Sequence, residues 1–178
     1  MTNKEFFISN WQRDSAITAK AIRSLPNDMK KLSFKHHEKF RSPWELVNHM
    51  APHGKEMAQA ATEGKSDLVN EGNFPLDSPT IYKSLEDAAK DVEANATKLV
   101  DLLKNYSDSD WETKNIPVYW GKMKIMEMPM MQFCWMMLFD TVHHRGQLTS
   151  YYRPIDSTQP SLMGPTLEEE EAMMAKMN

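Results

Sequence analysis

The stretch FDTVHHRGQLTSYYR, residues 139–153, decides the fold, because it places ionisable side chains on an otherwise apolar helix. It follows the methionine-rich run MKIMEMPMMQFCWMM, residues 123–137, and it ends just before Pro154. The segment from Glu127 to Arg153 is apolar on most sides, which predicts one long, central and most deeply buried helix. Ionisable groups in such a helix cost free energy unless a metal ion or a hydrogen-bond network pairs with them.

Three further helices are predicted before this segment. Apolar residues recur at helical spacing over residues 7–25, and a proline then ends the pattern. Ser42 and Glu45 form a capping box that starts a second helix over residues 43–63. A third helix begins after the N-cap candidate Ser84, and its inner stripe consists of Leu85, Ala88, Val92, Ala96, Leu99 and Leu103.

The remaining segments predict connections. Residues 65–80 read as a long loop, Val118–Lys124 as a short β-hairpin, and the C-terminal tail as a segment that wraps the helices and closes with a short helix. The predicted fold is therefore all-α: a four-helix bundle with one long crossover and a short β-hairpin. The sequence has no internal repeats and no change in amino-acid composition that would mark a domain boundary, so residues 1–178 are expected to form a single domain.

Composition narrows the class of protein. The formal net charge of −4 argues against a nucleic-acid-binding protein, and no apolar run is long enough to span a membrane. The N-terminus lacks the apolar segment of a signal peptide, and Cys134 is the lone cysteine, so we expect a cytoplasmic protein without internal disulfides. The 15 methionines are expected to fill gaps in the core, in preference to forming a thioether metal site.

Asp140 and His144 are the first two candidate metal ligands. They are four residues apart, so both side chains lie on one face of the helix, one turn apart. A third ligand must come from another helix, and the second helix offers His49 and His53. Two imidazoles and one carboxylate with open positions would suit Zn, Ni or Fe(II). A hydrogen-bond network without a metal is the alternative, and spacing alone does not favour the metal.

Several neighbours of these ligands have a structural and a functional interpretation. Pro52 should kink the second helix just after His49, which could turn His53 toward the site as a fourth ligand or a general base. His143 points about 100° away from His144, as a surface or supporting residue. The other expectations are an anion contact or a salt bridge for Arg145 and Gln147, close helix packing for Gly146, and a core position for Cys134.

The order of three motifs resembles the DinB-like (DinB/YfiT-like) family over essentially the whole chain. These motifs are RSPWELVNHM at residues 41–50, VHHRGQLTSYYRP at 142–154 and QPSLMGP at 159–165. The resemblance implies a four-helix bundle whose metal is held by three histidines, one on the second helix and two separated by four residues on the fourth. These positions carry His49, Asp140 and His144, so Asp140 departs from the family pattern.

The resemblance also implies a function. Relatives in this family include thiol-dependent transferases and isomerases, and metal-dependent hydrolysis is proposed for others. The expectation is therefore a metal-dependent transferase or hydrolase that acts on a small molecule, with a low-molecular-weight thiol as co-substrate. The alternative, favoured by Asp140, is a non-catalytic binding or stress-response module with a degenerate site. A homodimer is expected in both cases, from the resemblance and from Trp120, Met123 and Ile125, which lie outside any helical stripe.

Overall fold

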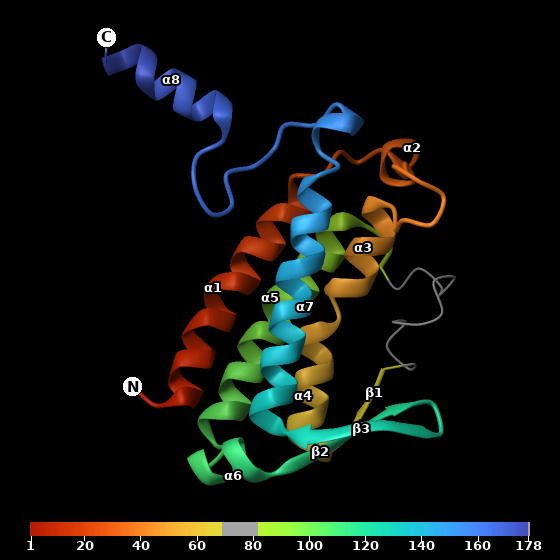
Figure 1. Ribbon diagram of the computed structural model, residues 1–178, viewed down its shortest axis with the longest axis vertical. Helices are drawn as coiled ribbons and strands as arrows, with labels where there is room; N and C mark the ends of the chain where they lie inside the picture. Colours follow the sequence, from red (N-terminus) through yellow and green to blue (C-terminus); the bar gives the residue numbers. More distant parts are fainter. Residues whose placement is uncertain (69–81, 178) are drawn as a thin grey trace.

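A computed structural model describes residues 1–68 and 82–177 of the chain, and Figure 1 shows the arrangement of its elements. The predicted loop over residues 65–80 lies mostly outside this part. The helical segments are α1 (Asn3–Arg23), α2 (Met29–Leu32), α3 (Pro43–Met50), α4 (His53–Glu63), α5 (Leu85–Lys104), α6 (Asp108–Thr113), α7 (Met130–Thr149), a 3-10 turn (Arg153–Ile155) and α8 (Leu167–Met177). The strands are β1 (Ser66–Asp67), β2 (Asn115–Trp120) and β3 (Met123–Pro129).

The long helices lie lengthwise beside one another around a shared interior. α1 packs against α5 and α7, and α4 packs against the same two helices from the other side, while α3 contacts α7 (Figure 1). One end of the interior is filled by residues such as Ile22, Leu46 and Tyr152, and the other end by residues such as Met57 and Phe133. The predicted helical segments are thus present, and the structure is mostly helical.

The second predicted helix is two helices. The capping box of Ser42 and Glu45 starts α3 as expected, but α3 ends at Met50 and α4 begins at His53. Pro52 causes this break, because proline has no N–H for an intrahelical hydrogen bond and its ring clashes with the preceding turn. The break lies between the two candidate histidines, so His49 lies in the last turn of one helix and His53 starts the next.

The fourth predicted helix is shorter than expected at both ends. Residues 127–129 belong to β3, and α7 ends at Thr149 before the separate turn at Arg153–Ile155. Nor is α7 the most buried helix: Phe139 is 63% exposed and Val142 is 39% exposed, and α5 buries as many residues as α7. The apolar surface of α7 therefore has one face directed to solvent.

The predicted hairpin is larger than expected and belongs to a small sheet. β2 and β3 pair antiparallel over residues 115–129, and Gly121 takes the left-handed conformation in the turn. β1 adds to β2 in parallel, so the structure has a three-stranded sheet where only a hairpin was predicted. The sheet lies across one end of the helices (Figure 1), where Val118 is fully buried.

The C-terminal tail does not wrap the helices. α8 has no buried residue and projects away from the rest of the molecule (Figure 1). Its first turn carries Glu168, which forms an ion pair with Arg153 at 2.9 Å, and Lys20 donates to the carbonyl of Ser161 at 2.6 Å. In the described part of this tail, which ends at residue 177, Leu162 is the one apolar side chain that packs against the core. No helix in residues 1–68 or 82–177 has the length and apolar character needed to cross a bilayer.

Candidate metal centre

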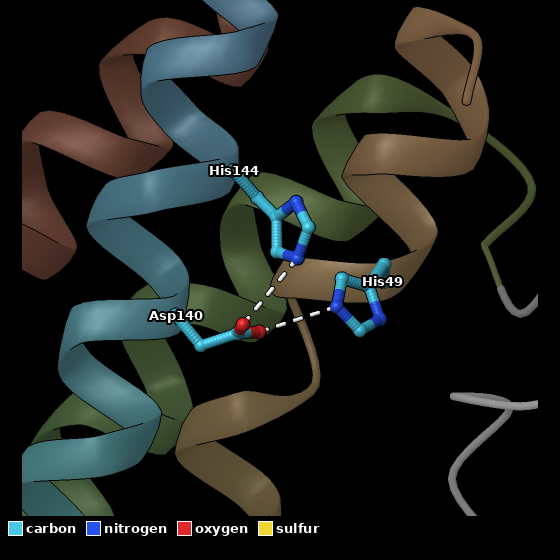
Figure 2. Close-up of side chains that lie close together, drawn as sticks. All are labelled: His49, Asp140 and His144. Carbon is cyan, nitrogen blue, oxygen red and sulfur yellow. Dashed lines mark ion pairs between the residues drawn. The ribbon is translucent and has the colours of Figure 1, made fainter. Parts of the chain in front are cut away.

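His49, Asp140 and His144 converge on one point between α3 and α7 (Figure 2). His49 comes from the last turn of α3, and the other two residues come from successive turns of α7. Nε2 of His49 lies 3.2 Å from Oδ2 of Asp140, and Nε2 of His144 lies 3.4 Å from Oδ1. One ligand atom of each residue lies within 4.8 Å of the others, so the predicted convergence is confirmed.

These separations fit the size of a metal ion. Two donor atoms bound to one tetrahedral zinc, with bond lengths of about 2.0–2.1 Å, lie about 3.3 Å apart. Each oxygen of Asp140 lies at about this distance from one histidine nitrogen, Oδ2 at 3.2 Å from His49 and Oδ1 at 3.4 Å from His144, and one ligand atom of each residue lies within 4.8 Å of the others. The three side chains could therefore hold a metal ion without a large rearrangement.

His53 joins the same cluster from the first residue of α4. Its side chain is almost completely buried, and its Nε2 lies 3.4 Å from Oδ2 of Asp140. The opposite nitrogen, Nδ1, lies 2.8 Å from Oγ1 of Thr141, and the Thr141 hydroxyl donates to the carbonyl of Met137. Because that hydroxyl has only one hydrogen, it must accept from His53. Neutral His53 therefore carries its hydrogen on Nδ1 and directs the lone pair of Nε2 toward Asp140.

In His144, as in His53, Nδ1 points away from Asp140 and Nε2 points toward it. Its Nδ1 lies 2.8 Å from the side-chain oxygen of Gln147, which can only accept, so Nδ1 carries the hydrogen. Its Nε2 lone pair then also faces the carboxylate. The amide nitrogen of Gln147 donates in turn to His143 at 3.0 Å. Gln147 thus fixes the tautomer of a candidate ligand, as residues behind metal-bound histidines usually do.

Two imidazole lone pairs and a carboxylate facing one point repel one another unless a positive charge lies among them. Either a proton or a metal cation would supply that charge. His49 can donate to Asp140 when no ion is bound, because its buried Nδ1 has no hydrogen-bond partner in residues 1–68 or 82–177 and nothing there fixes its tautomer. The donor set of the four side chains therefore fits a divalent cation.

The ionisation states favour the same conclusion. Burial lowers the pKa of His49, although the hydrogen bond to Asp140 opposes this, and burial lowers the pKa of His53 to about 3. For Asp140, burial alone would raise the pKa, but the imidazoles of His144 and His49, when a proton lies on the Nε2 that faces the carboxylate, outweigh it and hold the pKa well below its usual value. Neutral imidazoles beside an ionised carboxylate are the forms that bind metals.

A cavity of about 260 Å³ opens beside the candidate ligands. Its other walls are largely apolar and are formed by Leu68, Met126, Met136 and Met137. Two of these methionines come from α7, so part of the methionine-rich run lines a cavity instead of filling the core alone. The site combines potential metal ligands with space for a small molecule.

Sequence reasoning missed two residues of this site. Arg41 lies at the edge of the cavity, with Nη1 3.5 Å from Nε2 of His144, and burial lowers its pKa although the charge of Asp140 opposes this. Thr141 positions His53. Arg41 directly precedes the N-cap Ser42, and Thr141 directly follows Asp140. Their positions next to these residues were the one feature of the sequence that could have indicated a role in the site.

Other expectations had mixed outcomes. Arg145 forms a buried ion pair with Asp14 at 2.7 Å, which confirms the salt bridge and not the anion contact. Cys134 is a fully buried core residue, as expected, and burial raises the pKa of its thiol. Close packing at Gly146 was wrong, because a Cβ there would meet nothing within 4 Å, whereas Gly54 lies against Trp11 and Asn95.

Comparisons with known proteins agree with the fold and the motifs. The chain is similar to the crystal structure of a DinB-like protein from Bacillus cereus ATCC 10987, with a TM-score of 0.64, 22% identity and coverage of 88% of this chain and 95% of that one. A DinB-like protein from Bacillus subtilis gives a TM-score of 0.61 and 18% identity, with coverage of 89% and 99%. Comparison with curated proteins gave no match. A sequence model of the DinB family matches residues 1–174, and the chain therefore belongs to the DinB family.

Proposed function

We propose that this protein is a metal-dependent enzyme, built on a four-helix bundle, whose divalent ion is held by His49, Asp140 and His144. Zn, Ni and Fe(II) are the candidate metals, because all three bind sites of imidazole and carboxylate ligands. The observation that carries the proposal is the convergence of the three ligand atoms beside an apolar cavity of about 260 Å³. Membership of the DinB family supports it.

A metal with an open coordination position would lower the pKa of a bound water or thiol and so provide a nucleophile at neutral pH. A thiol-dependent transferase or a hydrolase of a small molecule is the reaction class that we propose, with a low-molecular-weight thiol as co-substrate. In this scheme the methionine-lined wall of the cavity excludes water from the reacting groups.

His53 is proposed as a fourth ligand in preference to a general base. Its Nδ1–H is held by Thr141, and its Nε2 lone pair faces the shared carboxylate oxygen. Metal-bound histidines usually have this arrangement, with one ring nitrogen fixed by a neighbouring oxygen and the other directed at the ion.

The proposal is tested by metal content and by three variants of the untagged protein. Mass spectrometry of the wild-type protein should find a transition metal at one equivalent per chain. Asp140→Ala should lose the metal together with part of the stability, and Asp140→His should keep or tighten metal binding. His143→Ala is the matched control, because this exposed residue neighbours His144 on α7 and should retain the metal. Full metal content in Asp140→Ala would contradict the ligand assignment.

A non-catalytic module is the second candidate, and one observation favours it. The guanidinium of Arg41 and the hydrogen bonds around Asp140 could hold the cluster together without an ion. In that case the wild-type protein would bind no metal even from metal-supplemented buffer.

We also propose a homodimer for both candidates. Its support is the exposed apolar surface, which includes Phe139 on α7 and Trp120 and Met123 on the sheet. Sedimentation at micromolar concentration should show a dimer, and a monomer alone would contradict the proposal.

A further inference from the structure

A second cavity, of about 310 Å³, adjoins the candidate metal centre. It lies between the segment before α3 and the last turn of α7, and it shares two lining residues, Arg41 and His144, with the cavity beside the metal centre. Phe40, Leu46 and Tyr151 provide apolar walls, and Lys39 adds a positive charge. A volume of this size suits a small organic molecule.

Arg41 places a positive charge without an ion-pair partner among the described residues in the wall of this cavity. The other arginines, at positions 13, 23, 145 and 153, each have a carboxylate within 4.0 Å. Arg41 has none among the residues that the structure describes, and its side chain is half-buried with Nη1 directed at the lone pair of His144, 3.5 Å away. The charges of Asp140 and Glu45 attract this guanidinium, but neither carboxylate lies close enough to form an ion pair with it, so this half-buried position favours an anion.

The surroundings of Arg41 are built to keep it in place. The hydroxyl of Tyr151 donates to the backbone carbonyl of Arg41 at 2.7 Å, which ties the segment before α3 to the end of α7. The ring of Tyr151 in turn stacks on His36 at a centroid distance of 4.2 Å. Among residues 1–68 and 82–177, no acidic residue lines the cavity, and Glu45, the nearest carboxylate in sequence, is occupied by the N-cap of α3 and by Lys35.

We propose that Arg41, with Lys39, binds the acid group of a small organic carboxylate whose apolar or aromatic part lies against Phe40 and Tyr151. A guanidinium offers two parallel N–H donors that match a carboxylate. Because Arg41 also contacts His144, a molecule bound in this way reaches the metal centre only with atoms close to its acid group. The inference rests on the proposed function for the reaction, but binding of the anion itself needs no metal.

The test uses benzoate as the probe, with neutral benzamide as its matched control, and isothermal titration of the metal-free full-length protein. A carboxylate of this size should bind with a dissociation constant of about 1 mM. Arg41→Gln should weaken benzoate binding about tenfold or more, because it removes a charge-assisted hydrogen bond. Arg13→Gln, at an exposed arginine on α1, should bind benzoate as the wild type does.

Measuring the metal content of Arg41→Gln distinguishes a failure of this inference from a failure of the proposed function. The variant should retain its metal, because Arg41 is not a ligand and its positive charge opposes a cation. The inference would be overturned by equal affinities for benzoate and benzamide, by unchanged benzoate binding in Arg41→Gln, or by no binding to the wild type at millimolar concentration. Equal affinity for inorganic phosphate and benzoate would overturn the assignment to an organic acid. A protein that binds benzoate but no metal would refute only the proposed enzyme.

Discussion

Replacing Thr141 by valine tests whether the orientation of His53 prepares the metal site. Valine has the shape and β-branching of threonine but no hydroxyl, so His53 Nδ1 loses its contact at 2.8 Å. A buried donor without a partner costs about 1–3 kcal/mol. His53 can reduce this cost by moving its hydrogen to Nε2 and donating to Asp140, 3.4 Å away, so we expect a loss of about 1 kcal/mol.

This compensation should be visible in metal affinity. With its hydrogen on Nε2, His53 no longer presents a lone pair to the ion, and the dissociation constant of the metal should rise about 10–100-fold. Thermal unfolding of the metal-free protein should shift downward by only about 2–4 °C, the shift that 1 kcal/mol produces in a domain of this size. Competition with a chromogenic chelator measures the first quantity and differential scanning calorimetry the second.

Thr97→Val is the matched control. Thr97 makes the same hydrogen bond to the carbonyl four residues earlier, to Glu93 at 3.1 Å, but it is exposed on α5 and lines neither of the two cavities beside the candidate ligands. It should change stability by less than about 0.5 kcal/mol and leave metal affinity unchanged. If Thr141→Val bound metal as tightly as Thr97→Val, the argument that Thr141 fixes a ligand tautomer would be wrong.

Three further predictions concern stability. Gly54→Ala should lower the free energy of unfolding in urea by about 1–3 kcal/mol, because its Cβ would lie 3.1 and 3.2 Å from two neighbouring side-chain atoms, whereas Gly146→Ala, with nothing within 4 Å, should not destabilise. The free energy of unfolding should fall as the pH drops from about 6.5 to about 3, because His53 takes up a proton in this pH range in the unfolded chain but not in the folded protein, where burial lowers its pKa to about 3. Urea titrations at several pH values should show a weaker pH dependence in His53→Gln. Arg145→Met leaves the Asp14 carboxylate buried without its 2.7 Å partner and should cost about 3–5 kcal/mol, seen as a large drop in the urea midpoint.

The helices and the convergence of the candidate ligands could be predicted because both depend on local spacing. The separation of Asp140 and His144 by four residues fixes their common face, and burial of Val47 and Met50 fixes the direction of α3 toward α7. Pro52 marks the position of the break from sequence alone. Each of these inferences uses residues within one or two turns of each other.

The features that were missed depend on contacts between distant segments. β1 joins the sheet by pairing Ser66 with Val118, and two residues carry no alternating pattern that could reveal a strand. Gly54 packs tightly because α5 brings Asn95 to it, whereas Gly146 faces open space on a similar helix. Arg41 enters the site because Tyr151 anchors its backbone across more than a hundred residues of sequence. Local patterns contain no information about such pairings.

The carboxylate of Asp140 touches all three histidines, through Oδ2 to His49 and His53 and through Oδ1 to His144. A histidine at position 140 would offer a single nitrogen to the centre and could not make these contacts at once. With a proton on Nε2 of His49, the aspartate would hold the candidate ligands close together before an ion arrives, so little conformational entropy would be lost when one binds. If the proposed site binds an ion, folding and metal loading would therefore be separate events, and the ion could leave and return without unfolding of the chain.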